Sequence, residues 1–213
     1  MAKVKAPALS MGGSGQIGKT MTFASWRGVN YVKQYTVPAN PQSADQQKTR
    51  GVFGWATATW KSSPSLFKAA WTAFAKGKPL TDRNAFIGAN VKALRIETDL
   101  TNIVFSPGSG GGLPPASATG TGAAGKITVA TVNPSAPAGW TITSMLAMAV
   151  KQGDAHTLGY SPIYEAADSV TFNSVQLTGL TAGTYVYGAL LVWTKPDGTA
   201  AYSVAITGTA NVT

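Results

Sequence analysis

The sequence predicts an α+β N-terminal domain, built from a β-hairpin plus helices, followed by an all-β sandwich. Three observations lead to this expectation: helix-type spacing of apolar residues before position 105, a stretch rich in Gly, Pro and Ser over 106–125, and short β-type runs after it. The chain has 213 residues, of which 44% are hydrophobic, so it can bury one sizeable core or two small ones. We therefore expect domains over 1–105 and 126–213, joined by a linker over 106–125.

The first element expected is a β-hairpin over residues 20–37. Apolar and aromatic residues mostly alternate there, and Arg27-Gly28 interrupts the alternation. Pro38 and Pro41 end this segment. Ser43 and Gln46 then form a capping box, in which a hydroxyl and a side-chain amide satisfy free backbone N–H groups at the start of a helix. A first helix should run from there to about Trp60.

Two more helices are expected before residue 105. Pro64 suits a first helical turn, where its missing N–H costs nothing. A second helix should follow and end at Lys76-Gly77, with an apolar face made of Leu66, Phe67, Ala70, Trp71 and Phe74. Thr81-Asp82 can cap a third, short helix. The segment from Leu94 to Phe105 is expected to be extended.

Residues 106–125 have the composition of a flexible linker. The stretch contains Gly, Pro, Ser, Ala and Thr, no charged residue and a single large apolar residue, Leu113. After this stretch, residues 185–193 have apolar side chains at both odd and even positions, so both faces of a strand formed there would be apolar. This pattern predicts a central strand that is covered on both faces. In residues 202–207, large apolar residues alternate with small or polar ones, which predicts a half-buried strand paired with it. Turn signals every 8–12 residues favour a sandwich of five to seven strands.

Charge is distributed unequally between the two halves of the chain. Residues 1–100 contain 14 bases and 4 acids, whereas residues 101–213 contain 3 bases and 4 acids. The N-terminal half is therefore expected to face an acidic partner, either protein or nucleic acid, although a merely solvated basic face has the same composition. The residues expected to make these contacts are Arg27, Lys33, Arg50, Arg83 and Arg95.

Residues 13–20 match the phosphate-binding pattern G-x-x-x-x-G-K-[ST], through Gly13, Gly18, Lys19 and Thr20. A working loop of this kind lies between a buried strand and the N-terminus of a helix. Here no apolar strand precedes the motif, and residues 21–26 have a β pattern. We expect a glycine-rich turn, and keep nucleotide binding as a weaker alternative.

Other chemical groups are scarce. The chain has no cysteine, which excludes disulfides and thiolate metal sites, and His156 is its one histidine. We expect no enzyme activity, no catalytic residue, no cofactor and no metal. No apolar run approaches the roughly 20 residues of a membrane-spanning helix, and the N-terminus lacks the core of a signal peptide. We therefore expect a product that is made in the cytoplasm and has no membrane partner.

Four tryptophans, Trp26, Trp55, Trp60 and Trp71, lie among basic residues. Such a mixture can stack bases and contact phosphates. No helix carries the closely spaced basic run of a major-groove reader, and a small domain needs large side chains to fill its interior. We expect most of these rings to be core, and keep nucleic acid as an alternative partner.

The segment Leu180-Thr181-Ala182-Gly183-Thr184-Tyr185 resembles the corner before the penultimate strand of fibronectin type III and related immunoglobulin-like domains. The spacing from Leu to Tyr is one residue shorter than in the fibronectin pattern, so the general immunoglobulin-like label fits better. The resemblance covers about residues 126–213. It implies an immunoglobulin-like sandwich in which the phenol of Tyr185 bonds back to nearby backbone.

Residues 14–90 are similar to a group of uncharacterised phage and prophage proteins. The matching features are S-G-x-x-G at Ser14 to Gly18, Trp26-Arg27-Gly28, Tyr31-Val32-Lys33, Asn40-Pro41, Gln46 or Gln47 with Arg50, a Trp-rich helix pair, Arg83-Asn84-Ala85-Phe86 and Asn90. This resemblance implies a virion structural protein, such as an accessory or decoration component of a head, neck or tail. Its partners would be other virion proteins and further copies of itself, and its location the virion, assembled in the bacterial cytoplasm.

Overall fold

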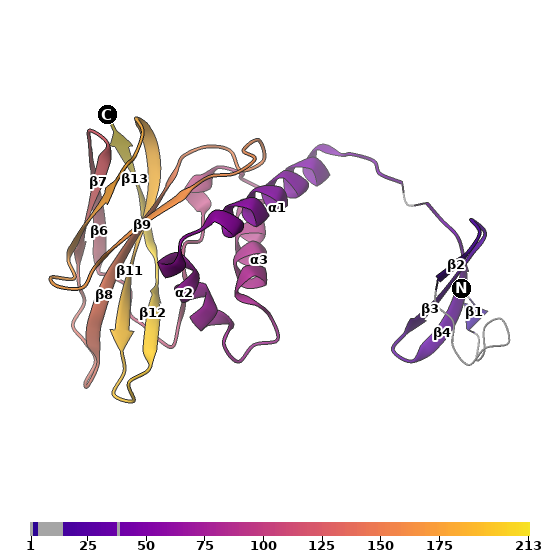
Figure 1. The fold of residues 1–213 in the computed structure, drawn as a ribbon, viewed down its shortest axis with the longest axis horizontal. Helices are drawn as coiled ribbons and strands as arrows, with labels where there is room; N and C mark the ends of the chain where they lie inside the picture. Colours follow the sequence, from indigo (N-terminus) through magenta and orange to yellow (C-terminus); the bar gives the residue numbers. More distant parts are fainter. Residues whose placement is uncertain (1, 4–14, 38) are drawn as a thin grey trace. The chain divides into compact units, whose positions relative to one another are not determined.

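A computed structural model of the chain describes residues 2–3, 15–37 and 39–213. The contacts between residues divide the chain into two units, Met1–Gln42 and Ser43–Thr213, which are described separately below (Figure 1). Three α-helices and three antiparallel sheets form in the described parts, so the composition is mixed and mainly β.

The small unit is one antiparallel sheet. Its strands are β1 (Ala2–Lys3), β2 (Gly15–Ile17), β3 (Met21–Trp26) and β4 (Val29–Gln34), in the order β1-β4-β3-β2. Arg27 and Gly28 join β3 to β4 with positive φ angles of 49° and 75°. Two such residues match the right-handed twist of a tight hairpin, and glycine adopts this conformation without strain. The hairpin predicted over 20–37 is confirmed.

The large unit begins with three helices: α1 (Ala44–Ser62), α2 (Ser65–Ala75) and α3 (Asp82–Leu94). The Ser43 hydroxyl accepts a hydrogen bond from the Gln46 N–H at 3.4 Å, and the Thr81 hydroxyl accepts one from Asn84 at 3.2 Å. The predicted start signals at Ser43 and Thr81 therefore act as caps, whereas Pro64, expected in the first turn of the second helix, immediately precedes that turn. The prediction of an extended segment from residue 94 is wrong in part, because residues 100–102 form a turn of 3₁₀ helix.

Two sheets complete the large unit. The three-stranded sheet has the order β10-β7-β6, with β6 (Ser117–Ala123), β7 (Lys126–Val132) and β10 (Ser174–Thr178). The six-stranded sheet has the order β5-β12-β11-β8-β9, and β13 also pairs with β11. Its strands are β5 (Pro107–Ser109), β8 (Thr141–Lys151), β9 (Ile163–Asp168), β11 (Gly183–Thr194), β12 (Ala200–Val204) and β13 (Ile206–Val212).

Strands β12 and β13 behave as one strand with a bulge. Val192 pairs with Tyr202 on β12, and Ala189 pairs with Ile206 on β13, so the second strand carries one extra residue between these pairs. Such an insertion is a β-bulge. The Ser203 hydroxyl accepts a hydrogen bond from the Leu191 N–H at 2.9 Å beside the interruption.

Strands β8 and β11 separate two hydrophobic cores. On β8, Met145, Ala147 and Ala149 face the three-stranded sheet, whereas Leu146, Met148 and Val150 pack with the helices. The side chains of β11 alternate in the same way, which confirms the prediction of a central strand covered on both faces. The large unit therefore has three layers: three-stranded sheet, six-stranded sheet and helices (Figure 1).

The helices belong to the same unit as the sheets, which corrects the expected division at residue 105. The indole N–H of Trp55 donates to the Ser161 hydroxyl at 3.0 Å, and that of Trp71 donates to the carbonyl of Phe105 at 2.9 Å. Buried Asn90 donates to the Val104 carbonyl and accepts from the Val104 N–H. The helices share their aromatic core with β8, β9 and β11, so they form a layer of the large unit.

Residues 106–125 are part of the sheets, which corrects the predicted linker. This segment contains β5 and β6, and β6 pairs along its full length with β7. Glycine serves close packing there: a Cβ on Gly120 would lie 2.3 Å from the Tyr187 ring, and one on Gly122 would lie 1.7 Å from the Asn211 carbonyl oxygen. A composition typical of flexible segments therefore has another physical cause here.

Candidate docking surface

The small unit has no buried residue among its described positions beyond residue 14. Its strands instead expose large apolar side chains, with Ile17 52% exposed and Trp26 65% exposed. Domains of about 40 residues rarely bury enough surface to be stable alone, and usually need a cross-link, a metal or a partner. This unit has no cysteine for a cross-link. Its stability therefore calls for contacts beyond its own strands.

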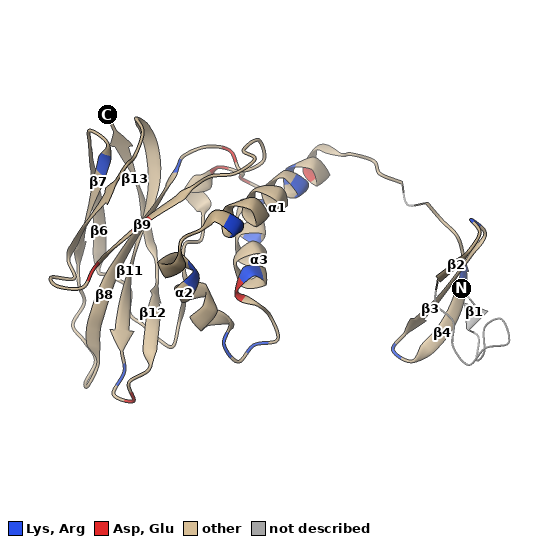
Figure 2. Cartoon of the chain, viewed as in Figure 1, with Lys and Arg blue, Asp and Glu red and all other residues tan. Residues whose placement is uncertain are grey.

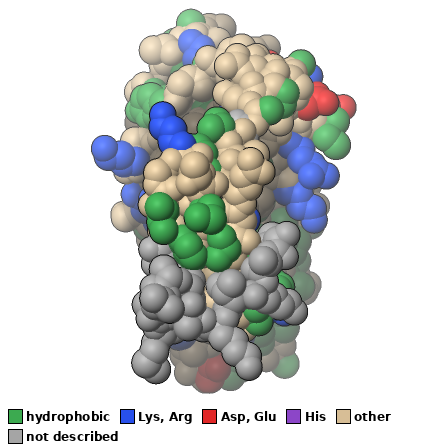
Figure 3. All heavy atoms as spheres, turned by 90° about the vertical axis from the view of Figure 1, so that its right-hand side faces the viewer, with side chains coloured by type: hydrophobic (Ala, Val, Ile, Leu, Met, Phe, Trp, Pro, Cys, Tyr) green, Lys and Arg blue, Asp and Glu red, His purple; other side chains and the backbone are tan. Residues whose placement is uncertain are grey.

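Both faces of the small sheet are partly apolar. Cross-strand pairing places four apolar residues on one face, namely Ile17, Met21, Phe23 and Val32, and four on the other, namely Ala24, Trp26, Val29 and Tyr31. Figure 3 shows hydrophobic side chains gathered on the surface that faces the viewer. Contiguous exposed apolar surface is typical of an interaction site.

The small unit is also uniformly basic. It contains five of the chain's bases, Lys3, Lys5, Lys19, Arg27 and Lys33, and none of its eight acids. Figure 2 shows this contrast with the large unit, where basic and acidic side chains are interspersed. A surface of one sign attracts partners of the opposite sign and repels copies of itself.

We name the face that carries Trp26, Val29, Tyr31 and Lys33, together with Arg27 at the turn, the basic hairpin surface. Lys33 lies opposite Thr22, and Val29 lies opposite Trp26, so these side chains share one face. The Arg27 guanidinium carbon lies 4.8 Å from the centre of the Trp26 ring. The hairpin therefore presents an aromatic ring and a cation together at its exposed tip.

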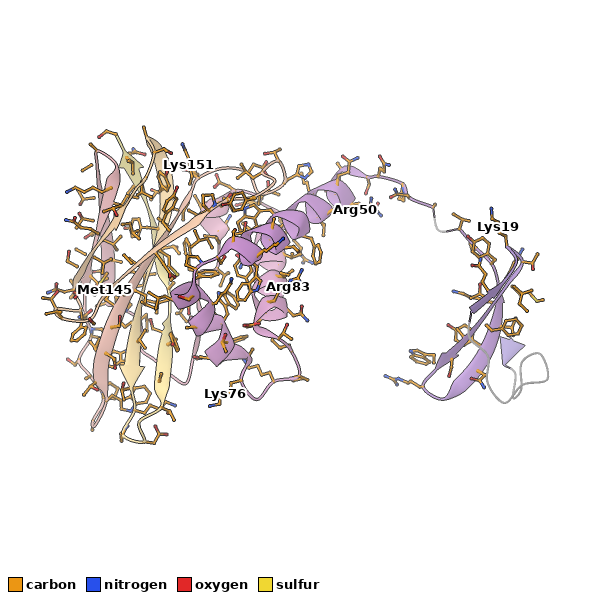
Figure 4. All side chains as sticks on the ribbon, in the orientation of Figure 1. Lys19, Arg50, Lys76, Arg83, Met145 and Lys151 are labelled. Carbon is orange, nitrogen blue, oxygen red and sulfur yellow. The ribbon has the colours of Figure 1, made fainter. Side chains whose placement is uncertain are left out.

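The other predicted contacts lie on the large unit. Arg50 is in α1, Arg83 is in the first turn of α3 and Arg95 caps its C-terminal end, and all three are exposed. Figure 4 labels Arg50 and Arg83. Arg95 lies twelve positions after Arg83, a distance of about 18 Å at 1.5 Å per residue. Of the five predicted residues, Arg27 and Lys33 belong to the small unit and the other three to the large unit, and Lys33 lies four positions after the first residue of β4, which follows the turn that holds Arg27.

The predicted phosphate-binding motif lies in a strand–turn–strand. Gly13 is outside the described residues. Gly18, Lys19 and Thr20 form the turn between β2 and β3, with φ of 53° at Gly18, and the Thr20 hydroxyl donates to the Ile17 carbonyl at 2.9 Å. The backbone leads into an antiparallel strand, so no helix N-terminus faces the turn. This agrees with the glycine-rich turn that we expected.

Titratable groups in the described parts of the chain are dispersed. No cluster of three His, Asp or Glu side chains with metal-binding geometry occurs among the described residues. The Asp154 carboxylate accepts a hydrogen bond from the His156 N–H at 2.8 Å, and hydrogen bonds from the Thr98 side chain and from this N–H lower the pKa of Asp154. His156 itself packs against Gly51 of α1. Among the helices that the structure describes, none is long and apolar enough to cross a membrane.

Sequence reasoning did not identify the exposed apolar residues of the small sheet as part of a site. Their signal was present: residues 21–32 place apolar side chains at both odd and even positions, while no other segment was predicted to cover either face. Comparison with protein-family models finds no match for this chain. A search of curated proteins finds no similar protein either.

Proposed function

We propose that this chain is a non-enzymatic structural protein of a phage-type particle, which docks through its small N-terminal sheet and displays its large unit. The observation that carries the proposal is the small unit, whose sheet exposes apolar side chains on both faces and whose sequence contains five bases and no acid. Such a unit gains stability when an acidic, partly apolar surface covers it. The docking region proposed here is residues 1–42, narrower than the 1–105 expected from sequence.

We further propose that the two sheets of the large unit form an immunoglobulin-like sandwich. Leaving out the short edge strand β5 and counting β12 and β13 as one strand, one sheet contains the first, second and fifth strands, and the other contains the third, fourth, sixth and seventh. The first, second and fifth strands match strands A, B and E of such domains, and the third, sixth and seventh match C, F and G, while the fourth strand pairs with the third instead of joining the first sheet. The Tyr185 hydroxyl also accepts a hydrogen bond from the Thr181 N–H at 3.2 Å, at the corner where this family has its tyrosine.

Charge reversal tests the docking role directly. The double variant Arg27→Glu/Lys33→Glu should reduce incorporation of the chain into particles by at least about tenfold, which corresponds to about 1.4 kcal/mol of binding free energy. The matched control is Arg83→Glu/Arg95→Glu, which makes the same change of charge on the exposed surface of α3. Incorporation is measured by quantitative mass spectrometry of purified particles.

The control should stay within about twofold of the unmodified chain, well below a tenfold effect on binding. If the hairpin variant is incorporated normally, the docking role of the small sheet is wrong. If only the α3 variant is lost, docking occurs through the helices of the large unit instead.

A nucleic-acid-binding role is the second candidate, favoured by the exposed Trp26 ring with Arg27 beside it. Base stacking on an exposed ring and phosphate contacts from nearby cations are typical of single-strand binding. Binding of a labelled oligonucleotide to the intact chain should then weaken steeply with salt and depend on Trp26. Absence of binding at low salt would remove this candidate.

A further inference from the structure

A shallow groove of the large unit lies outside the docking region proposed above. It has a volume of about 1180 Å³ and lies between α2 and the edge of the six-stranded sheet formed by β5 and β12. A smaller hollow of about 480 Å³ continues it along β5, because Ala73, Lys76, Ser109 and Gly110 line both. Figure 1 shows α2 beside β12 at this place.

Small residues line the inside of the groove. Ala69 and Ala73 from α2 face Gly110 and Ala200 from the sheet edge. Ala69 and Ala73 are four positions apart, so they lie on one face of the helix. Where these small residues face one another, a second polypeptide backbone can approach closely, and its small apolar side chains can contact the alanines.

Basic residues surround this apolar interior. Lys68 and Lys76 line the main groove and Lys78 lines its continuation, whereas Asp82 is the one acid in the lining. The Asp82 carboxylate already accepts hydrogen bonds from the Thr72 hydroxyl and from the Arg83 N–H. Figure 4 shows Lys76 at the C-terminal end of α2. The charge of the groove therefore complements an acidic partner.

One polar group in the groove wall lacks a partner. The Ser109 hydroxyl oxygen is buried and makes no hydrogen bond in the described structure, although Ser109 lines both hollows. A buried hydroxyl without a partner costs free energy, and a ligand could recover it if the Ser109 side chain rotated toward the groove. A backbone carbonyl or N–H of a bound peptide is suited to this role.

We propose that this groove binds an acidic, extended polypeptide segment of a partner protein. Its acidic side chains would pair with Lys68, Lys76 and Lys78, and its small apolar side chains would contact the alanines. A nucleic acid fits less well, because the Lys78 ammonium covers the Phe74 ring at 3.1 Å from its centre and Tyr202 is half-buried, so neither ring is open for stacking. The groove lies within the large unit, so this inference is independent of docking by residues 1–42.

The test uses the full chain and a fluorescein-labelled peptide of about ten residues that alternates Glu and Val, which is long enough to span about 33 Å when extended. Binding is measured by fluorescence anisotropy, and the site by chemical-shift changes of backbone amides. We expect binding with shifts concentrated at Ala69, Ala73, Ser109 and Gly110. A peptide that alternates Lys and Val should bind at least about tenfold more weakly, as expected for reversed charge.

Two variants and a control make the test specific. Ala73→Leu fills the junction of the two hollows with a residue that favours helix, and Lys76→Glu reverses an exposed charge. Each should weaken binding of the Glu-Val peptide by at least about tenfold, or 1.4 kcal/mol. Lys61→Glu reverses a charge on α1 outside the groove and should leave the affinity unchanged.

Absence of binding, or shifts located elsewhere on the chain, would overturn the proposal. Unchanged affinity in both Ala73→Leu and Lys76→Glu would overturn it equally. If Ala73→Leu lowers the melting temperature, Lys76→Glu decides the outcome alone, because its side chain makes no packing contact in the core.

Discussion

The small and large units show how differently similar residues behave when their surroundings differ. Trp71 of the large unit is completely buried and its indole N–H is paired, whereas Trp26 of the small unit is 65% exposed at a hairpin tip. Burying a large aromatic ring contributes a few kcal/mol to folding, and an exposed ring contributes almost none. The large unit is stabilised from within, and we propose that a partner surface supplies this stabilisation for the small unit.

The largest expected effect is the difference in stability between two variants, in which Trp71 or Trp26 is replaced by alanine. Trp71→Ala should lower the free energy of unfolding of the large unit by about 3–5 kcal/mol, because it leaves a cavity and an unpaired carbonyl at Phe105. Trp26→Ala should change it by less than about 0.5 kcal/mol. Urea unfolding followed by circular dichroism gives both values. Loss of helix signal with an unchanged sheet transition would show that the helices are a separate domain.

Glycine substitutions test whether residues 106–125 are packed. Gly120→Ala should destabilise the large unit by about 1–3 kcal/mol, since the new methyl group would overlap the Tyr187 ring. Gly54→Ala on α1 meets nothing within 4 Å and should stabilise the chain by about 0.5–1 kcal/mol. Thermal unfolding of the Gly120→Ala and Gly54→Ala variants, each compared with the unmodified chain, measures both changes. Equal stability of Gly120→Ala and the unmodified chain would restore the flexible linker.

A smaller effect is expected at the junction of α2 and β9. The Glu165 carboxylate accepts hydrogen bonds from the N–H groups of Leu66, at 3.3 Å, and Phe67, at 2.8 Å. It takes the place of a capping side chain, because the N-cap residue of α2 is Pro64, which has none. Glu165→Ala should cost about 1 kcal/mol, as loss of an N-cap does. Glu165→Gln keeps an acceptor and should cost less. Hydrogen exchange of α2 amides measures the change, and unchanged exchange in both variants would contradict it.

The smallest expected effect is a pH dependence at Asp168. Hydrogen bonds from the Thr171 side chain and from the Val170 and Thr171 N–H groups lower the pKa of Asp168. A lowered folded-state pKa means that the carboxylate stabilises the fold above its ordinary pKa of about 3.9 and that this contribution is lost as the pH falls. Asp168→Asn should therefore flatten the decline of melting temperature between about pH 5 and pH 3. An identical decline in both proteins would exclude this carboxylate as a cause.

Local signals predicted the local structure well. The Arg27-Gly28 turn, the caps at Ser43 and Thr81 and the two-sided strand over 185–193 depend on neighbouring residues or on strand periodicity, which a sequence displays directly. Interactions between distant segments were not predicted. The bond from Trp55 to Ser161 spans 106 positions, and nothing near Trp55 shows that a sheet covers the helix.

The candidate site was predicted only in part. Arg27 and Lys33 were singled out by charge, but the same criterion also selected Arg50, Arg83 and Arg95, which lie on the other unit. Glycine content led to a wrong prediction of a linker. Gly120 and Gly122 lie in a stretch with the composition of a flexible segment, but both are in close contact with neighbouring strands. A flexible glycine and a packed one can be distinguished only from the strands that lie against them, here those of Tyr187 and Asn211.

Amide hydrogen exchange of β3 and β4, compared between the free chain and purified particles that contain it, tests the central claim most directly. In the free chain, we expect these strands to exchange far faster than β8 and β11. In the particle, their exchange should slow by at least about 100-fold, or about 2.7 kcal/mol, because a partner covers the sheet. Equal exchange of β3 and β4 in both states would contradict the account.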